Sequence, residues 1–366
     1  MARLGDVCEI LDSKRIPITA SNRKAGIYPY YGANGIQDYV DDYIFDDELV
    51  LLAEDGGHFG STDKPIAYRV SGKCWVNNHA HVLKPKAILD VDYLCYSLMF
   101  RDVSNVVNGA TRQKLTQADM REIEIPLLTL GEQLAIVEKL NKIFALISLR
   151  KQQLSKLDEL VKSRFIELFG DSTHSRNRVL FEDISVFVTV GIANSATHAY
   201  ADNGIVMLRN QNIKENYLDE KDLIHITPDF AEKYGSKQLS ENDILVIRTG
   251  YPGVACLVPK KYEGCQTFTT LIVRLKNSTS AHANYVCHYI NSSFGKDYVE
   301  QSKVGVAQQN FGAKALAKMP IVVPPMELQE EFATFVEQVD KSKFEIQKSL
   351  EKLETLKKAL MQKYFG

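Results

Sequence analysis

A long internal repeat constrains this chain more than any other feature of its sequence. Residues 109–170 align with residues 305–366 without a gap, at one constant offset (305 − 109 = 196 and 366 − 170 = 196). Identical residues at paired positions include Gln113/Gln309, Ile125/Ile321, Gln133/Gln329, Leu154/Leu350, Leu157/Leu353 and Phe169/Phe365. Solenoid units repeat every 20 to 50 residues or so, which is far shorter than this offset. The repeat therefore predicts two tandem domains, each closed by the same long segment.

Both closing segments are predicted to be helices of unusual length. Their apolar residues recur at every third or fourth position, which places one apolar stripe along each helix. No proline or internal glycine stands between residues 132 and 168 or between residues 327 and 364. Each helix can therefore extend over about 37 residues, or about 55 Å at 1.5 Å per residue. Prolines precede both segments, and Gly170 and Gly366 follow them, as expected at helix starts and ends.

The two apolar stripes predict that the helices pack against each other. Each buried Leu or Ile in such a stripe is worth roughly 1.5–3 kcal/mol, so an unpaired helix would be costly. The chain leaves the first domain along one helix and returns along the other, so the pairing should be antiparallel with a pseudo-twofold axis. The predicted helix–helix interface consists of Leu140, Ile143, Ile147, Leu154 and Leu157 in the first helix and Val336, Val339, Ile346, Leu350 and Leu353 in the second.

Charged and apolar residues modify this simple stripe. Arg150, Arg164, Lys343 and Lys357 interrupt it, and such residues usually lower stability while fixing register or partner. Further apolar residues lie off the stripe, including Phe144, Leu146, Leu149, Phe335 and Phe344. They fit either packing on the globular domains or a docking face for the helices of another subunit.

The globular parts ahead of the helices are predicted to be α/β mixtures (α+β) rich in strands. Predicted strands cover residues 48–52, 66–70 and 75–77 in the first part and 243–247, 254–258 and 270–274 in the second. Helical patterns occur near residues 93–100 and 285–290. The predicted boundaries are a first domain at 1–130, a first helix at 131–170, a second domain at 171–325 and a second helix at 326–366.

Composition limits the class of protein. The chain has 366 residues, 45% of them hydrophobic, which suffices for two ordinary cores. No uncharged apolar run approaches the 20 or so residues of a membrane span, and the N-terminus lacks the apolar centre of a signal peptide, so we expect a soluble cytoplasmic protein. The six cysteines form no CxxC pair and indicate neither a disulfide framework nor a zinc site. His79 and His81 could share a strand face, but without Cys or acidic partners nearby they argue little for a metal.

Motifs for catalysis and nucleotide binding are missing from the sequence. It contains no GxxxxGK[ST] loop, no GxGxxG after a strand, no GxSxG elbow and no HExxH helix. It also lacks an Asn-Pro-Pro-Tyr tetrapeptide of the kind that amino-methyltransferases use. The glycine cluster at residues 54–60 is the nearest match to a phosphate cradle, but its acidic pair would repel phosphate, and a tight strand-to-strand loop explains it better. We conclude that the chain binds rather than catalyses.

Several segments resemble the specificity subunits of type I restriction-modification enzymes. Tyr31-Gly-Ala-Asn-Gly35 and Trp75-Val-Asn-Asn-His-Ala-His-Val82 resemble the first target-recognition domain of that family, and Asp243-Ile-Leu-Val-Ile-Arg-Thr-Gly250 resembles its strand-and-turn signature. The Ile-Pro-Leu and Val-Pro-Pro entries into the long helices resemble its two central repeats. The chain is short for this family, and Leu127-Leu128-Thr129 replaces the usual Pro-Pro, which leaves the start of the first helix open.

This resemblance implies a division of labour between subunits. Each globular domain would be a target-recognition domain that reads one half of an interrupted sequence in double-stranded DNA. The paired helices would set the spacer and dock two modification subunits. S-adenosylmethionine, ATP and Mg would be bound by the modification and restriction (ATP-dependent translocase/nuclease) subunits, so this chain would carry no catalytic residue, metal or cofactor.

The formal net charge of −2 argues against electrostatic capture of DNA by the whole surface, because duplex affinity depends mainly on Lys and Arg. Basic residues nevertheless gather in predicted loops. The loops at residues 109–114 and 305–310 hold equivalent places in the repeat and offer Arg, Gln and Asn, which pair with guanine or adenine edges. The predicted DNA-binding residues are Lys14, Arg15, Arg23, Lys24, Arg112, Gln113, Lys114, Arg248, Tyr251, Lys303, Gln308, Gln309 and Asn310. Each of them also fits a solvated surface charge, a turn amide or, for Tyr251, turn packing.

Two other classes of function stay open. The chain could serve a related system in which methyltransferase and nuclease are fused in one partner. It could also be a coiled-coil scaffold for other proteins, although a scaffold needs no pair of divergent, loop-rich domains. Because DNA binding weakens steeply with salt, salt dependence separates the DNA hypotheses from the scaffold.

Overall fold

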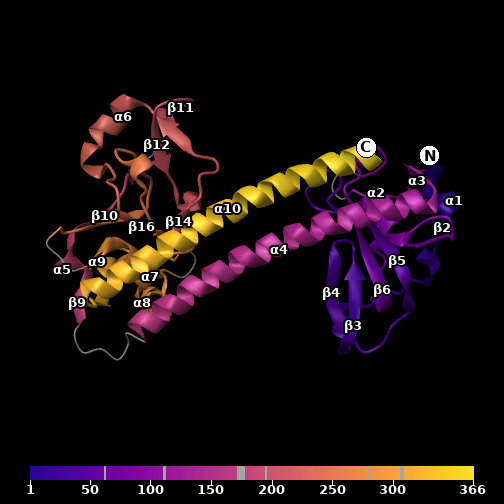
Figure 1. The fold of residues 1–366 in the computed structure, drawn as a ribbon, viewed down its shortest axis with the longest axis horizontal. Coiled ribbons are helices and arrows are strands. Elements are labelled where there is room, and N and C mark those ends of the chain that lie inside the picture. The colour runs from indigo at the N-terminus through magenta and orange to yellow at the C-terminus, as the bar shows by residue number, and fades with distance from the viewer. Residues whose placement is uncertain (62, 110–112, 171–177, 194–195, 278–280, 306–308) are drawn as a thin grey trace. The chain divides into compact units, whose positions relative to one another are not determined.

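The computed structural model describes residues 1–61, 63–109, 113–170, 178–193, 196–277, 281–305 and 309–366 (Figure 1). The chain divides into two compact units. The first unit comprises Met1–Gln153 and Ile346–Gly366, and the second comprises Leu154–Glu345. The chain therefore passes from the first unit to the second within one long helix and returns within the other.

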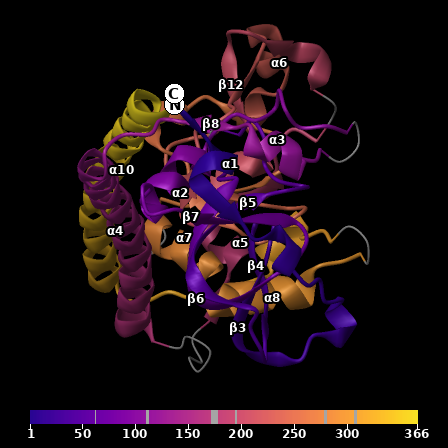
Figure 2. The ribbon, with the colours of Figure 1, turned by 90° about the vertical axis from the view of Figure 1, so that its right-hand side faces the viewer.

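A six-stranded sheet forms the centre of the first unit, in the order β2-β7-β5-β6-β3-β4. The strands are β2 (Cys8–Ile10), β3 (Ala25–Gly32), β4 (Gly35–Val40), β5 (Phe45–Ala53), β6 (Ala67–Val76) and β7 (Ala80–Pro85). β3 runs parallel to β6, whereas β5 is antiparallel to both of its neighbours. Helix α2 (Val91–Met99) packs against β5, β6 and β7 (Figure 2).

The continuous apolar run of β5 follows from its central position. Val50 and Leu52 belong to a core cluster that includes α2 and the start of the first long helix. Leu49 and Leu51 belong to another cluster that includes Val82. Since both faces of the strand are covered, alternation of apolar and polar residues is lost, as is usual for a strand buried on two sides.

The second unit contains two four-stranded sheets. One has the order β10-β19-β16-β17 and is antiparallel throughout, and the other has the order β11-β15-β12-β18 with β12 and β18 parallel. Their strands are β10 (Ser185–Val190), β11 (Tyr200–Ala201), β12 (Ile205–Leu208), β15 (Ile224–Ile226), β16 (Ile244–Val246), β17 (Ala255–Leu257), β18 (Gln266–Thr267) and β19 (Leu271–Leu275). A short hairpin of β13 (Ile213–Lys214) and β14 (Tyr217–Leu218) and the helices α6 (Pro228–Lys233), α7 (Ala283–Asn291) and α8 (Ser293–Ser302) complete it.

The internal repeat is visible as matching elements. α3 (Gln117–Arg121) and α9 (Ala313–Ala317) differ by the same offset as the repeat (313 − 117 = 196). β8 (Glu124–Ile125) pairs with β1 (Ala2–Arg3), and its counterpart β20 (Pro320–Val322) pairs with β9 (Arg178–Leu180). The helices α1 (Leu4–Val7) and α5 (Phe181–Ile184) follow β1 and β9. Each unit thus begins and ends in the same way.

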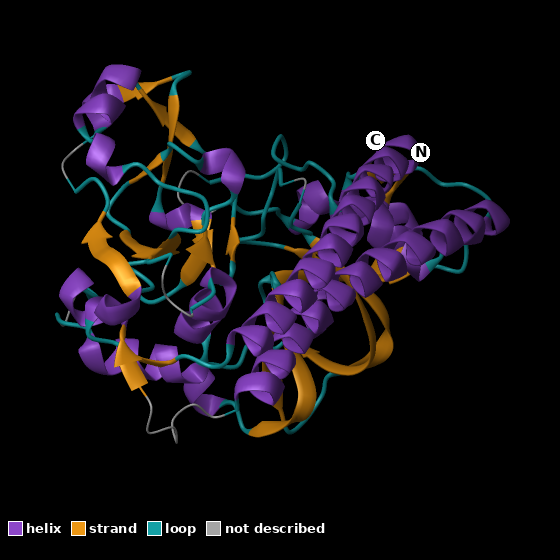
Figure 3. Ribbon diagram, turned by 60° about the vertical axis from the view of Figure 1, so that its left-hand side comes forward, coloured by secondary structure: helices purple, strands orange, loops and turns teal. Residues whose placement is uncertain are grey.

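The two long helices are continuous, and each is slightly longer than the about 37 residues expected from the sequence. α4 spans Leu130–Phe169 and α10 spans Met326–Phe365, with 40 residues in each (Figure 3). In the first unit the Nζ of Lys151 lies 3.1 Å from a carboxylate oxygen of Glu354. In the second unit the Nζ of Lys343 lies 2.5 Å from Asp158, and Arg164 binds Glu331. Residue numbers rise along α4 as they fall along α10, which confirms the antiparallel pairing.

The charges that interrupt the stripe are mostly paired. Lys357 binds Glu354 and lies over the ring of Phe144 at 5.8 Å, while Arg150 donates to Gln153 at 2.8 Å. All ten residues predicted for the helix–helix interface are buried or half-buried. Off the stripe, Phe144 packs against the first unit's core, whereas Leu146, Leu149 and Phe344 remain exposed. Some off-stripe residues therefore pack on a globular domain, and others stay exposed and could contact another subunit.

Several strands of the globular parts were not predicted, among them β3, β7 and β10, and one predicted boundary is wrong. The segments 66–70 and 75–77, expected as separate strands, form the single strand β6, because the pairing with β5 continues through the polar residues between them. All six cysteines are free, and five of them are buried. None of the described helices has an apolar stretch long enough to cross a membrane.

Candidate nucleic-acid interface

Each unit closes a short loop just ahead of α3 or α9. In the first, Asn108 and Lys114 exchange backbone hydrogen bonds of 2.9 and 2.7 Å; in the second, Val304 and Asn310 exchange two of 3.0 Å. These residues match at the repeat offset (304 − 108 = 196 and 310 − 114 = 196). We call the segments 108–114 and 304–310 the first and second loop. Arg112 and Gln308, predicted to bind DNA, lie outside the described residues.

Both loops are held against the segment that follows the central strand of their sheet. In the first unit the amide of Leu115 donates to the carbonyl of Glu54 at 2.7 Å, and in the second the amide of Phe311 donates to that of Arg248 at 2.9 Å. The amide of Gly56 donates to the carbonyl of Gln113 at 3.3 Å. Residues 54–60 lie between β5 and β6, as the strand-to-strand interpretation predicted, and the Gly56 amide supports the base of the first loop.

A buried polar network lies beneath the first loop. Glu54 binds Arg15 at 2.5 Å and Lys114 at 3.0 Å. Asp12 accepts hydrogen bonds from the amide of Val82 at 2.9 Å and from the side chain of Gln117 at 3.0 Å. Asp12 and Glu54 are only 7% and 8% exposed. Segments far apart in the chain thus meet under the loop through opposite charges.

The carboxylates of this network are held in their charged form. Burial raises the pKa of Asp12, but hydrogen bonds from His81 and Gln117, with the charge of His81, outweigh it and lower that pKa below its ordinary value. Burial likewise raises the pKa of Glu54, and the side chains of Arg15 and Lys114 outweigh it, again lowering the pKa. The ion pairs are therefore part of the folded state at neutral pH.

His81 occupies the centre of the network and is fully buried. Its Nδ1 lies 2.6 Å from Oδ2 of Asp12, and its Nε2 lies 2.9 Å from the carbonyl of Leu115. Both of these partners are hydrogen-bond acceptors, so His81 links Asp12 to the backbone of Leu115. Sequence reasoning found no acidic partner for His81, because Asp12 and Glu54 come from distant segments.

The ligand atoms of Asp12, Glu54 and His81 lie within 4.8 Å of one another, a spacing that could suit a metal ion. However, the guanidinium of Arg15 lies 2.5 Å from Glu54 and 3.6 Å from Asp12, and Lys114 takes the other oxygen of Glu54. These cations already neutralise the carboxylates that a metal would need. The cluster is an ion-pair network rather than a candidate metal centre.

The second loop is fixed by different side chains. Arg248 donates from Nε to the side-chain oxygen of Asn310 at 3.0 Å, and Lys303 donates to Gln309 at 2.6 Å. Lys303 also pairs with Glu300 at 2.5 Å. The carbonyl of Arg248 accepts from Phe311 as the carbonyl of Glu54 accepts from Leu115, so Arg248 is the structural counterpart of Glu54. Asn310 is the counterpart of Lys114 at the repeat offset. The two loop bases thus share the same backbone hydrogen bonds but are held by different side-chain pairs.

Tyr251 stands on the same turn as Arg248 and is 84% exposed. Gly250 and Gly253 on either side have φ of +88° and +94°, a backbone conformation that favours glycine and lets the turn project. An exposed aromatic ring of this kind can stack on a base or wedge between base steps. The structure thus leaves Tyr251 available for nucleic acid.

The remaining predicted residues fall into two groups. Lys14, Lys24, Gln113 and Gln309 are exposed and available to a ligand. Arg23 lies instead against β3 and β4, where it pairs with Asp38 at 3.4 Å and covers the ring of Tyr30 at 4.3 Å. Like Arg15, it is partly buried and paired within the protein. Contacts between these side chains and DNA stay a prediction.

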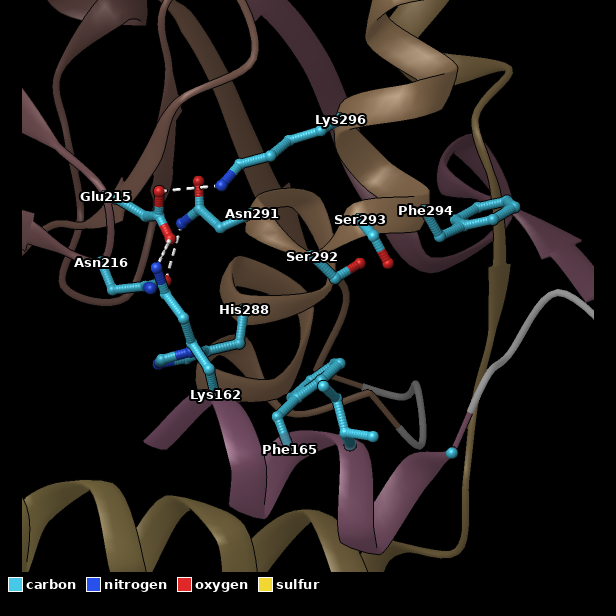
Figure 4. A pocket seen from close by; sticks show the side chains of 12 residues that line it. Lys162, Phe165, Glu215, Asn216, His288, Asn291, Ser292, Ser293, Phe294 and Lys296 are labelled. Atoms are coloured by element: carbon cyan, nitrogen blue, oxygen red, sulfur yellow. Dashed lines mark hydrogen bonds and ion pairs between the residues drawn. The ribbon is translucent and has the colours of Figure 1, made fainter. Parts of the chain in front are cut away.

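A pocket of about 470 Å³ lies elsewhere, in the second unit (Figure 4). Glu215 binds Lys162 at 3.0 Å and Lys296 at 2.9 Å, and Asn291 donates to Asn216 at 2.6 Å. Burial lowers the pKa of His288 on its wall to about 3, so this imidazole is neutral. Because Glu215 joins lysines of α4 and α8 across the pocket, we interpret it as a structural junction between α4, α7 and α8.

Comparisons with known proteins agree with this picture. Residues 1–159 and 186–358 match the family described as the type I restriction modification DNA specificity domain. A Haemophilus influenzae protein named as a type I restriction enzyme specificity subunit is 39% identical over 145 residues, which cover 40% of this chain and 37% of that protein. The StySPI specificity subunit of Salmonella potsdam is 24% identical over 355 residues, which cover 87% of this chain and 74% of that protein.

A solved structure shares the fold. The S subunit of a type I restriction-modification system from M. genitalium superposes with a TM-score of 0.59 at 13% identity, covering 100% of this chain and 95% of that one.

Proposed function

The chain belongs to the family of type I restriction modification DNA specificity domains, and from this premise we propose that it is the specificity subunit of such a system. Each unit reads one half of a bipartite DNA sequence. The observation that carries this proposal is the matching backbone hydrogen bonds at the bases of the two loops, between Asn108 and Lys114 and between Val304 and Asn310, together with the different side chains found there. A duplicated scaffold with divergent chemistry is what two readers of different half-sites require.

The chemistry of the loops suits base edges. Gln113 and Gln309 are exposed, and a Gln side chain can form paired hydrogen bonds with adenine in the major groove. In the first unit Arg15 and Lys114 neutralise Glu54, so this carboxylate does not repel a phosphate near the loop. Tyr251 adds a stacking surface in the second unit. DNA binding is therefore compatible with the net charge of −2, because the local charge at the loop differs from that of the whole chain.

The paired helices set the spacer between half-sites. α4 and α10 each continue from one unit into the other over 40 residues, or about 60 Å at 1.5 Å per residue. Half-sites on one face of B-DNA lie about 34 Å apart, a distance that helices of this length can span. Exposed apolar residues remain on these helices for docking the modification subunits: Leu146 and Leu149 in the first unit and Phe344 in the second.

Members of this family recognise DNA and do not catalyse. We assign methyl transfer from S-adenosylmethionine to the modification subunits, and ATP- and Mg-dependent cleavage to the restriction subunits, with no cofactor on this chain. We also propose a cytoplasmic location, where these subunits meet DNA.

The test is genome-wide adenine methylation in a host that expresses this chain with its neighbouring methyltransferase gene. The same host without this chain is the control. We expect one bipartite methylated motif that disappears in the control. Identical methylation in both hosts, with the methyltransferase expressed, would favour the scaffold hypothesis, and cleavage by the same partner polypeptide that methylates would point to a fused system.

A second measurement addresses the scaffold directly. Binding of the assembled complex to DNA that carries the motif should weaken steeply between about 50 and 200 mM salt. Binding that does not respond to salt would count against DNA recognition.

A further inference from the structure

The buried network beneath the first loop gathers several ionisable side chains from distant segments. It brings together Asp12, Glu54, Arg15, His81 and Lys114. Burying charges costs free energy, and a buried ionic cluster is often no more stable than an apolar replacement of the same volume. A cluster of this kind is therefore better explained by the geometry it imposes on its surroundings.

Several contacts of the network end on the base of the first loop, while others bind β7 through Val82 and Ala80. The amide of Leu115 donates to Glu54 and the carbonyl of Leu115 accepts from His81, so both backbone polar groups of this residue are fixed. Lys114 and Gln117, on either side of Leu115, bind Glu54 and Asp12. The network thus fixes the position at which the loop leaves the core.

We propose that His81, Asp12 and Glu54 are positioning residues that set the precision with which Gln113, at the base of the first loop, reads a base, without touching the DNA themselves. This inference rests on the proposed function and adds the residues that set the precision of one reader. Base readout needs paired hydrogen bonds with defined geometry, and a loop that shifts at its base loses that geometry. The second loop is fixed by Arg248 and Asn310 instead, so the two readers are positioned independently.

The central variant is His81→Gln. A glutamine cannot donate from both ends of its amide, so one of its contacts, to Asp12 or to Leu115, is lost. We expect methylation in the host to extend to sites with a changed base in one half of the motif, while the other half stays strict. Discrimination against such a mismatch should fall by about tenfold, within the range that a single base contact provides.

A compensating variant separates positioning from general damage. In Asp12→Asn with His81→Gln, the new amide of residue 12 can donate to the new carbonyl oxygen of residue 81, and Gln117 can turn its own amide to match. This double variant should recover much of the lost discrimination. Arg248→Leu, which removes the corresponding contact from the second loop, should relax the opposite half of the motif.

His288→Gln is the matched control, because His288 is also buried but lines the pocket of the second unit rather than the network beneath the first loop. It should leave the motif unchanged. An unchanged motif in His81→Gln, or equal relaxation of both halves, would overturn the inference while leaving the proposed function intact. If His81→Gln yields no folded chain, Gln117→Ala takes its place. It removes the hydrogen bond to Asp12 and should relax the same half of the motif. A wild-type chain that directs no motif would instead refute the proposed function itself.

Discussion

Removing seven residues from each long helix should shorten the spacer of the recognised sequence. We choose residues 149–155 of α4 and residues 345–351 of α10, which match at the repeat offset (345 − 149 = 196). They surround the positions where each helix passes from one unit into the other, after Gln153 and after Glu345. The deletions therefore leave the packing of each unit on its own helix segments largely untouched.

The size of the effect follows from helix geometry. Seven residues at 1.5 Å per residue shorten each helix by about 10 Å, which corresponds to about three base pairs at 3.4 Å each. A heptad falls only about 20° short of two full helical turns, so the apolar stripe stays in register and each unit keeps its face. The two half-sites should keep their sequence and move closer together.

Genome-wide methylation of a host that carries the double deletion measures the spacer directly. Deleting residues 149–155 alone is the control, because it leaves seven residues of α10 unmatched and should abolish methylation. An active double deletion with the original spacer would refute the role of the helices in setting it.

Three further predictions concern stability and binding. The buried side chain of Gln133 accepts a hydrogen bond of 2.8 Å from the amide of Asp90 and donates bonds of 3.0 and 2.8 Å to the carbonyls of Ile88 and Leu128. Because Gln133→Leu removes all three, the free energy of unfolding in urea should fall by about 2–4 kcal/mol. A change too small to measure would contradict this. Burial lowers the pKa of His288 from 6.5 to about 3. Between these two pH values the unfolded chain binds more protons than the folded chain, so the free energy of unfolding falls as the pH drops below 6.5. His288→Phe should reduce this pH dependence, which denaturation curves at pH 7 and pH 4.5 measure. Because Tyr251 is 84% exposed, Tyr251→Ala should leave the melting temperature unchanged and weaken DNA binding by about 1–3 kcal/mol in competition assays, whereas equal affinity would exclude stacking.

The long helices could be predicted because their signal is local. Apolar spacing, flanking prolines and the terminal Gly170 and Gly366 define each helix from neighbouring residues alone. The antiparallel pairing then follows from chain connectivity. The repeated glutamine was visible as Gln133/Gln329, but its role was not, because its hydrogen bonds reach Asp90 in one unit and His282 in the other.

The network beneath the first loop could not be predicted, because its residues are distant in the sequence. Asp12, Glu54 and His81 lie on separate segments, and only the sheet order β2-β7-β5 brings these segments together. Arg15 was selected as a DNA contact for its charge and its place in a loop, yet its guanidinium is paired with Glu54. Periodicity identifies helices, whereas such pairings depend on strand order.

The central claim is that two independent readers share one chain, and a chimaera tests it most directly. Residues 178–323 would be exchanged for the matching segment of a type I specificity subunit with a different known target, and the methylated motif would be determined. We expect a hybrid motif in which one half is unchanged and the other half comes from the donor. A motif changed in both halves, or the parental motif in full, would contradict it.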